Sequence, residues 1–174
     1  MNHVPPSVRG FSLIEVLVAV LVFSLGLLGL AGLLVVSTQS SHASYLRTQA
    51  GFLAEQMANR MRSNPEGVWG GAYDAAYPVA AAIGACNSAA GCSPAQVATR
   101  DQAVWSRQLQ QFLPGAGASI ACTQPAGGPA VSATQFAYRP PYAGSCQMSI
   151  RWTEAGLTRG GQPGVQTFAW TFQP

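Results

Sequence analysis

The sequence predicts an α+β fold in which one long N-terminal α-helix packs on an antiparallel β-sheet, with one extra short helix. Three observations predict it. A proline-free apolar run spans residues 11–36, and the segment after it places apolar side chains every three or four residues. The last third of the chain instead alternates apolar and polar side chains. These are the periods of a helix and of strands that bury one face.

The apolar run, residues 11–36, is the predicted membrane-spanning half of the helix. As a helix it would be about 39 Å long, against a hydrocarbon core of about 30 Å. Its only charged side chain is Glu15, although an acidic side chain at the centre of a membrane helix costs about 2.5–3.5 kcal/mol. An ordinary secretory signal has a shorter apolar core and a small-x-small cleavage site. A plain signal anchor explains the length of the run but does not explain Glu15.

Residues 37–64 are the predicted head-packing half of the same helix. Its apolar stripe consists of Leu46, Ala50, Leu53, Met57 and Met61. Spacings of three and four place these side chains on one side of a helix. The helix should end at Asn64, because a residue before proline avoids the α conformation.

Residues 65–174 form the predicted globular head. An irregular connection leads to a helix that starts at Ser93, with Pro94 and Gln96 completing a capping pattern, and ends at "LPG", residues 113–115. Asp101 is expected to act on the dipole or the cap of this helix. Four strands should follow, with inward residues Ile120 and Cys122, Phe136 and Tyr138, Met148, Ile150 and Trp152, and Phe168, Trp170 and Phe172.

The segment "RGFSLIEVLVAVLVF" resembles the class III signal of type IV pilins and of the pseudopilins of type II secretion systems. In that family a short polar leader ends in glycine, phenylalanine usually follows, and a glutamate comes four positions later. Gly10, Phe11 and Glu15 match all three positions. The resemblance implies a pilin-like fold and a subunit of a filament system.

The same resemblance implies how the chain is processed and where it goes. A prepilin peptidase would cut between Gly10 and Phe11, remove the leader at residues 1–10 and N-methylate Phe11. Arg9 favours a cytoplasmic N-terminus. The chain would then cross the inner membrane once, with a periplasmic head, before it enters a pilus at the cell surface.

Four cysteines, at positions 86, 92, 122 and 146, lie on the exported side, where disulfides persist. Sequence alone allows three pairings. We favour Cys86–Cys92, which encloses a short flexible turn, and Cys122–Cys146, whose side chains should both point inward from the sheet. Zinc binding is the competing interpretation, but no C-x2-C pattern is present and His42 is the one histidine after the leader.

The composition disfavours several other functions. The net charge of +3 is small and there is no basic stripe, so no nucleic-acid partner is predicted. A serine–histidine–aspartate site would have to use His42, and "GAGAS", residues 115–119, lacks features of a dinucleotide loop. We therefore predict no enzyme, no catalytic residues, no metal site and no cofactor.

Two further segments resemble the PilV group of minor pilins: "ANRMRSNPEGVWGGAY", residues 58–73, and the pattern from Asp101 to Pro114. This resemblance implies a minor pilin in a priming or tip complex that initiates pilus assembly and supports twitching motility or adhesion. Its partners would be other minor pilins, the major pilin and the inner-membrane assembly platform, with a tip adhesin as a candidate. A minor pseudopilin and a membrane-anchored periplasmic enzyme or binding protein are the alternatives. Glu15 would act in assembly, by meeting the terminal amine of a neighbouring subunit.

Overall fold

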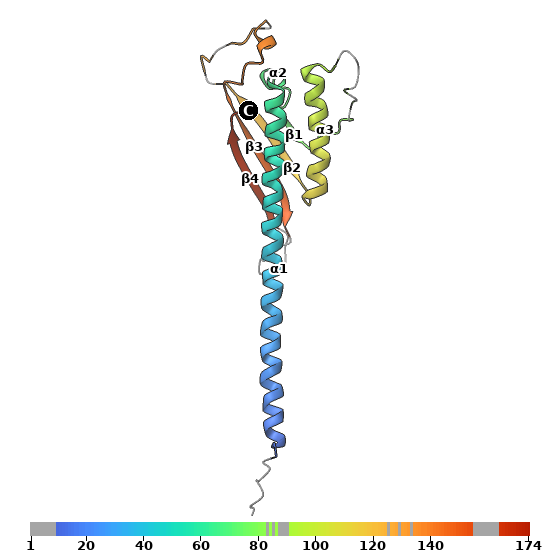
Figure 1. Cartoon of the computed structure of the whole chain (residues 1–174), viewed down its shortest axis with the longest axis vertical. Helices are drawn as coiled ribbons and strands as arrows, with labels where there is room; N and C mark the ends of the chain where they lie inside the picture. Colours follow the sequence, from blue (N-terminus) through green and yellow to red (C-terminus); the bar gives the residue numbers. More distant parts are fainter. Residues whose placement is uncertain are drawn as a thin grey trace, which may run out of the picture. The chain divides into compact units, whose positions relative to one another are not determined.

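The computed structural model describes residues 10–82, 84, 86, 91–124, 126–128, 130–132, 134–154 and 164–174. Residues 1–9 of the expected leader lie outside this set. The chain divides into two compact units, residues 1–41 and residues 42–174. Each unit is described by itself below (Figure 1).

Helix α1 spans Leu13–Ser63, a length of 51 residues. It stays helical through Gly26, Gly29 and Gly32. It ends one residue before the Asn64-Pro65 pair, as the sequence predicts. In the second unit its buried residues include the whole expected stripe, Leu46, Ala50, Leu53, Met57 and Met61. The predicted burial of this apolar stripe is therefore confirmed.

A second, five-residue helix that the sequence did not predict, α2 (Pro65–Trp69), follows at once. Asn64 is its N-cap, and the amide of Gly67 donates to the Asn64 side-chain oxygen at 3.3 Å. Pro65 stands at the first helical position, where its missing N–H costs nothing. The Asn-Pro pair thus ends one helix and begins the next.

The sheet is antiparallel with strand order β1-β2-β3-β4. Its strands are β1 (Ala75–Tyr77), β2 (Gly117–Thr123), β3 (Ser145–Glu154) and β4 (Gly164–Phe172). Three of these strands are where the sequence predicts them. In β3 the expected inward residues Met148, Ile150 and Trp152 are all buried. In β4, Trp170 lies on the expected face but is only half-buried.

Two parts of the strand prediction were wrong. The residues around Phe136 form a 3-10 helix, η1 (Gln135–Tyr138), and the Tyr138 side chain is 87% exposed. Arg139 follows in the left-handed region at φ 47°, and two prolines come next. Proline cannot donate to a strand ladder, so a strand does not extend here. The remaining strand is β1, which falls within the expected irregular connection.

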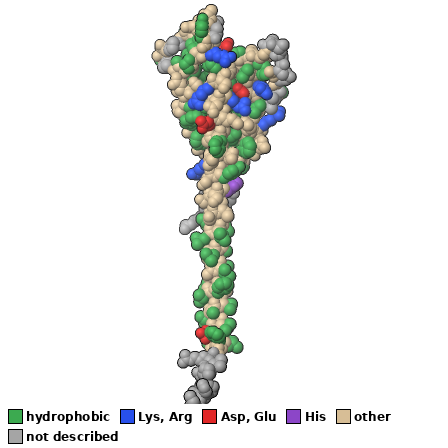
Figure 2. Space-filling model, viewed as in Figure 1, with side chains coloured by type: hydrophobic (Ala, Val, Ile, Leu, Met, Phe, Trp, Pro, Cys, Tyr) green, Lys and Arg blue, Asp and Glu red, His purple; other side chains and the backbone are tan. Residues whose placement is uncertain are grey.

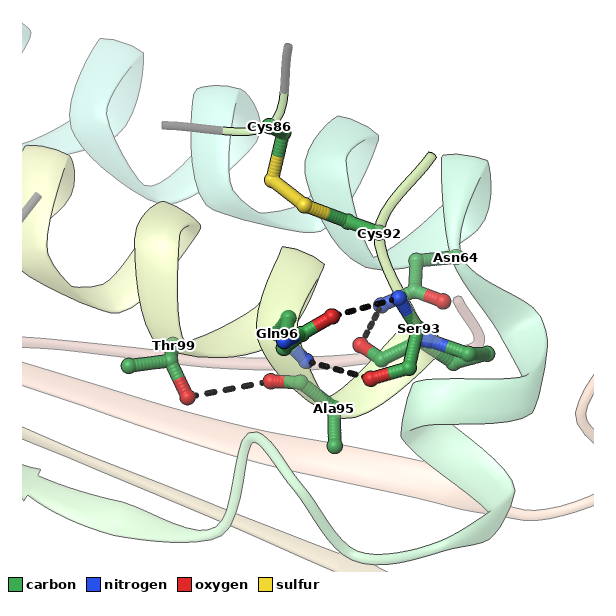
Figure 3. Close-up of a disulfide and its surroundings, with 8 residues drawn as sticks. Asn64, Cys86, Cys92, Ser93, Ala95, Gln96 and Thr99 are labelled. Carbon is green, nitrogen blue, oxygen red and sulfur yellow. Dashed lines mark hydrogen bonds between the residues drawn. A yellow bond between two sulfur atoms is a disulfide. The ribbon is translucent and has the colours of Figure 1, made fainter. Parts of the chain in front are cut away.

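Helix α3 (Pro94–Phe112) begins with the capping box that the sequence predicts. The Ser93 hydroxyl accepts from the Gln96 amide at 3.3 Å, and the Gln96 side chain accepts from the Ser93 amide at 2.9 Å (Figure 3). Two otherwise unpaired amides of the first turn are thereby satisfied.

The core of the second unit joins α1, α3 and one face of the sheet. Trp105 of α3 is fully buried, and its indole N–H donates to the Leu53 carbonyl of α1 at 2.8 Å. Tyr77 of β1 packs edge-on against the same ring, with centroids 4.9 Å apart. Trp105 therefore connects three elements that are distant in sequence.

Candidate functional site

The first candidate site is the Gly10-Phe11 junction before α1. Both residues precede the helix, and the Phe11 side chain is 85% exposed. The helix begins where the Ser12 carbonyl accepts from the amides of Glu15 and Val16, at 3.0 and 3.3 Å. The Gly10–Phe11 peptide bond therefore lies outside the helix.

The segment after this junction has exposed apolar side chains along its length, and Figure 2 shows one face of it. It is the one helix in the described residues that is long and apolar enough to cross a membrane, with a mean hydropathy of 2.7 and no buried residue in that stretch. The Ser24 hydroxyl donates to the Val20 carbonyl at 2.6 Å, so this polar group is satisfied within the helix. Such a surface is stable only in lipid or against other apolar helices.

Residues 6–31 match the family model of the prokaryotic N-terminal methylation motif. The chain carries a type IV pilin-like signal. No curated protein and no solved structure shows significant similarity to the chain. The motif implies processing by prepilin peptidase and assembly in a pilus or a secretion system.

Glu15 lies in the first turn of α1 of this pilin-like chain and is exposed. A carboxylate there is favoured by the positive end of the helix dipole. It is the only aspartate, glutamate, lysine or arginine between Gly10 and Arg47. Within the apolar run of residues 11–36 it is the one side chain able to form an ion pair with a neighbouring molecule.

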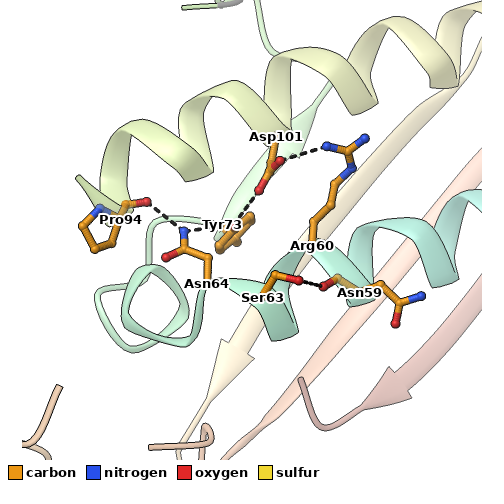
Figure 4. A network of polar contacts seen from close by, with 7 residues as sticks. All are labelled: Asn59, Arg60, Ser63, Asn64, Tyr73, Pro94 and Asp101. Carbon is orange, nitrogen blue, oxygen red and sulfur yellow. Dashed lines mark hydrogen bonds and ion pairs between the residues drawn. The ribbon is translucent and has the colours of Figure 1, made fainter. Parts of the chain in front are cut away.

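A second candidate site is a polar network in the head (Figure 4). Arg60 of α1 forms an ion pair with Asp101 of α3 at 2.9 Å. The Tyr73 hydroxyl donates to the other Asp101 oxygen at 2.9 Å, and the Asn64 amide donates to that hydroxyl at 3.1 Å. Asn64 also donates to the Pro94 carbonyl at 2.8 Å. The network thereby connects the last turn of α1, the N-cap of α2 and the N-terminal half of α3.

The expected role of Asp101 at the start of α3 was wrong. Asp101 lies well inside the helix, whose first turn is capped by Ser93, and its partners are Arg60 and Tyr73. Capping is a local interaction that the sequence shows directly, whereas Arg60 is 41 residues away. The spacing of "RMRSNP" and Asp101 gave no signal for this contact beyond the family resemblance.

Two tyrosines next to this network have perturbed acidities. Burial raises the pKa of Tyr73 well above its usual range, and nearby Asp101 adds to the effect. Burial also raises the pKa of Tyr77 to about 12. The Tyr77 hydroxyl donates to the Tyr73 carbonyl at 2.8 Å and accepts from the Gln102 side chain at 3.2 Å. Both phenols are therefore neutral structural donors at physiological pH.

The structure joins the cysteines in the pairing that we favoured from the sequence. Cys122 of β2 and Cys146 of β3 are directly opposite each other in the strand register, with Cα atoms 4.0 Å apart. Cys86 and Cys92 have Cα atoms 5.4 Å apart and lie next to the start of α3 (Figure 3). One bridge therefore links two strands and the other closes a loop in front of a helix.

The remaining candidates do not assemble into a catalytic site. His42 is exposed on α1, with its ring 6.5 Å from that of Tyr45. In the part of the chain that the structure describes, no three histidine, cysteine, aspartate or glutamate side chains form a group able to hold a metal ion. "GAGAS" forms a turn and the start of β2, with Gly115 at φ 58°.

Proposed function

We propose that the chain is a minor pilin of the type IV pilus that belongs to a priming or tip complex. The single observation that carries the proposal is the position of Glu15. It is the one charged side chain in the exposed apolar run of residues 11–36, four residues after Phe11, which we expect to become the mature N-terminus.

Cleavage after Gly10 would give Phe11 a new terminal amine. In lipid an isolated carboxylate tends to take up a proton, since burial disfavours the charged form. Between staggered subunits, the Glu15 carboxylate can meet the Phe11 amine of a neighbour in a low dielectric, which strengthens their attraction. Glu15 would then favour assembly over the single subunit.

The head supports the choice of a minor pilin. Arg60, Asn64, Gly67 and Tyr73 all fall within the segment that resembles the PilV group, residues 58–73. Each of them takes part either in the polar network at the end of α1 or in the N-cap of α2. The residues that carry the resemblance therefore share one structural role in this head.

Deleting the gene in its native host tests this proposal. Loss of surface pili and twitching, with unchanged secretion of type II substrates, is expected. The deletion strain complemented with the wild-type gene is the control. Loss of secretion with normal pili would instead make the chain a pseudopilin, which has the same kind of signal.

Detection of the chain in purified pili, together with other minor pilins, tests the tip or priming role. We expect it at far lower abundance than the major pilin. Absence of the chain both from pili and from a complex with minor pilins in the inner membrane would overturn the proposal.

A further inference from the structure

Strand β4 forms an edge of the sheet in the head (Figure 1). It has nine residues and pairs with β3 along its whole length. Among the described residues, no backbone hydrogen bond reaches its other side. Such an edge is a template on which another chain can add a strand.

The register shows which backbone groups face this open edge. The Cys122 amide points toward β1, because it donates to the Asp74 side chain at 3.0 Å. The backbone groups of Cys122 therefore point away from Cys146, its opposite residue in β3, and the two form a non-hydrogen-bonded pair of the ladder. The backbone N–H and C=O of Cys146 instead face Phe172 of β4 and form hydrogen bonds with it. By alternation, the open edge displays the N–H and C=O groups of Val165, Thr167, Ala169 and Thr171.

The edge lacks the features by which proteins usually prevent strand pairing. Its sequence, "GVQTFAWTF", contains no charged residue and no proline. Natural edge strands are usually short, charged, interrupted by proline or covered. On the face of the sheet that points away from α1, the β4 side chains are exposed, so no described element covers that face of the strand.

A groove of about 350 Å³ lies beside this edge, on the side of the sheet that faces α1. Its lining residues are Thr48, Gly51, Phe52 and Glu55 of α1 with Phe168 and Trp170 of β4. Phe52 is 66% exposed, and a Cβ atom at Gly51 would meet nothing within 4 Å. A strand added to β4 would direct every second side chain over this apolar groove.

We propose that the open edge of β4 accepts an extended segment of a partner protein as a fifth strand. Its alternate apolar side chains would occupy the groove, and one basic side chain would pair with Glu55. Glu55 is exposed and has no hydrogen-bond or ion-pair partner among the described residues. A negative charge beside an apolar groove favours a basic residue in the occupant.

A second copy of this chain fits the site less well. If two β4 strands paired, the groove would receive the inward residues of the other β4, which are Gly164, Gln166, Phe168, Trp170 and Phe172. None of these is basic, so Glu55 would stay unpaired. The proposal concerns the head alone and does not depend on how α1 assembles.

Hydrogen exchange of β4 amides in the full-length chain tests the proposal. The chain is measured alone in detergent and in the complex isolated from the native inner membrane. The amides of Thr167 and Ala169 should exchange about tenfold or more slowly in the complex, because a new strand would protect them. The amides of Phe168 and Trp170 should be protected in both samples and serve as internal controls.

Three variants separate the parts of the site. Ala169→Pro removes an N–H at the open edge but no bond to β3, and Ala169→Thr is its matched control. Gly51→Leu adds a side chain that occupies the groove from a position where a Cβ atom meets nothing within 4 Å, with Gly51→Ala as control. Glu55→Arg reverses the charge. Protection of Thr167 should be lost in these three variants and kept in both controls, while thermal unfolding shows that each head is folded.

Equal exchange of Thr167 and Ala169 in both samples would overturn the proposal. Protection that appears when the purified chain is merely concentrated would show that a second copy occupies the edge, and would overturn the assignment to a partner protein. If Ala169→Pro fails to fold, Gly51→Leu still decides the matter, since it should leave the head at least as stable.

Discussion

Single residues decide how the helices of the head join, and Asp101 is the central one. Its two oxygens accept from Arg60 and Tyr73, so one carboxylate is both the counter-charge of a guanidinium and the hydrogen-bond acceptor of a buried phenol. The Asp101 side chain is only 13% exposed. A charged group that is this buried and fully partnered stabilises the fold chiefly because its removal leaves the partners uncompensated.

We expect Asp101→Asn to destabilise the head by about 1.5–3 kcal/mol, the usual range for hydrogen bonds to charged groups. The reason is that Arg60 loses its counter-charge in a half-buried setting. Denaturant unfolding of the full chain in detergent measures the change. Glu55→Gln, which alters an exposed carboxylate, is the control and should lie within about 0.5 kcal/mol of wild type. Equal stability of the two variants would contradict the structural role of Asp101.

The buried tyrosines give a pH dependence. The folded state raises the pKa values of Tyr73 and Tyr77, the latter to about 12, so it favours their neutral forms. This stability is fully present below the unfolded pKa of about 10 and is lost as the pH rises from there through the folded values. Burial also raises the pKa of Tyr142, so ultraviolet titration should show three of the five tyrosines ionising late. Tyr77→Phe should remove one of them, and early ionisation of all five would contradict their burial.

The elements differ in how far the sequence alone predicts them. The end of α1 and the start of α3 depend on adjacent residues, Asn64-Pro65 and the Ser93 capping box, so local chemistry predicts both. β1 has three residues and exists because it pairs with β2, which no local pattern indicates. The strand expected at Phe136 rested on two alternating residues, and the prolines after it prevent pairing.

The same limit applies to the candidate sites. The motif at Gly10, Phe11 and Glu15 is continuous in sequence and could be identified without a structure. The Arg60–Asp101 contact and the open edge of β4 depend on how distant elements pack together. The open edge of β4 follows from the register of three strand pairs, and no spacing in the sequence gives that register.

Two tryptophans on the same face of the sheet should differ in their contribution to stability. Trp152 is 2% exposed, so Trp152→Ala should cost about 3–5 kcal/mol. Trp170 is half-buried at the groove, so Trp170→Ala should cost about 1–2 kcal/mol, because less apolar area returns to water. Denaturant unfolding of both variants checks the order. A larger loss of stability for Trp170→Ala than for Trp152→Ala would mean that Trp170 is buried in the core and does not line an open groove.

At the scale of the whole molecule, the two units have different tasks. The first presents apolar side chains with one carboxylate. The second has a packed core and contains two disulfides. Lipid alone can satisfy the apolar side chains of the first unit but not Glu15. Under the proposed function, another subunit would supply the positive charge that lipid lacks.

Glu15→Ala should leave membrane insertion and cleavage after Gly10 intact but reduce recovery of partner pilins. Glu15→Gln should behave like it, since glutamine keeps the shape and loses the charge. Co-purification at matched protein levels, together with a twitching assay, measures the effect. Normal partner recovery in both variants would show that Glu15 does not act through its charge.

The most direct test of the central claim is the mass of the N-terminal peptide of the chain isolated from its native host. We predict that residues 1–10 are absent and that the chain begins at Phe11 with one added methyl group on its amine. A mature chain that begins near residue 37, or one that keeps its leader, would contradict a pilin-like subunit.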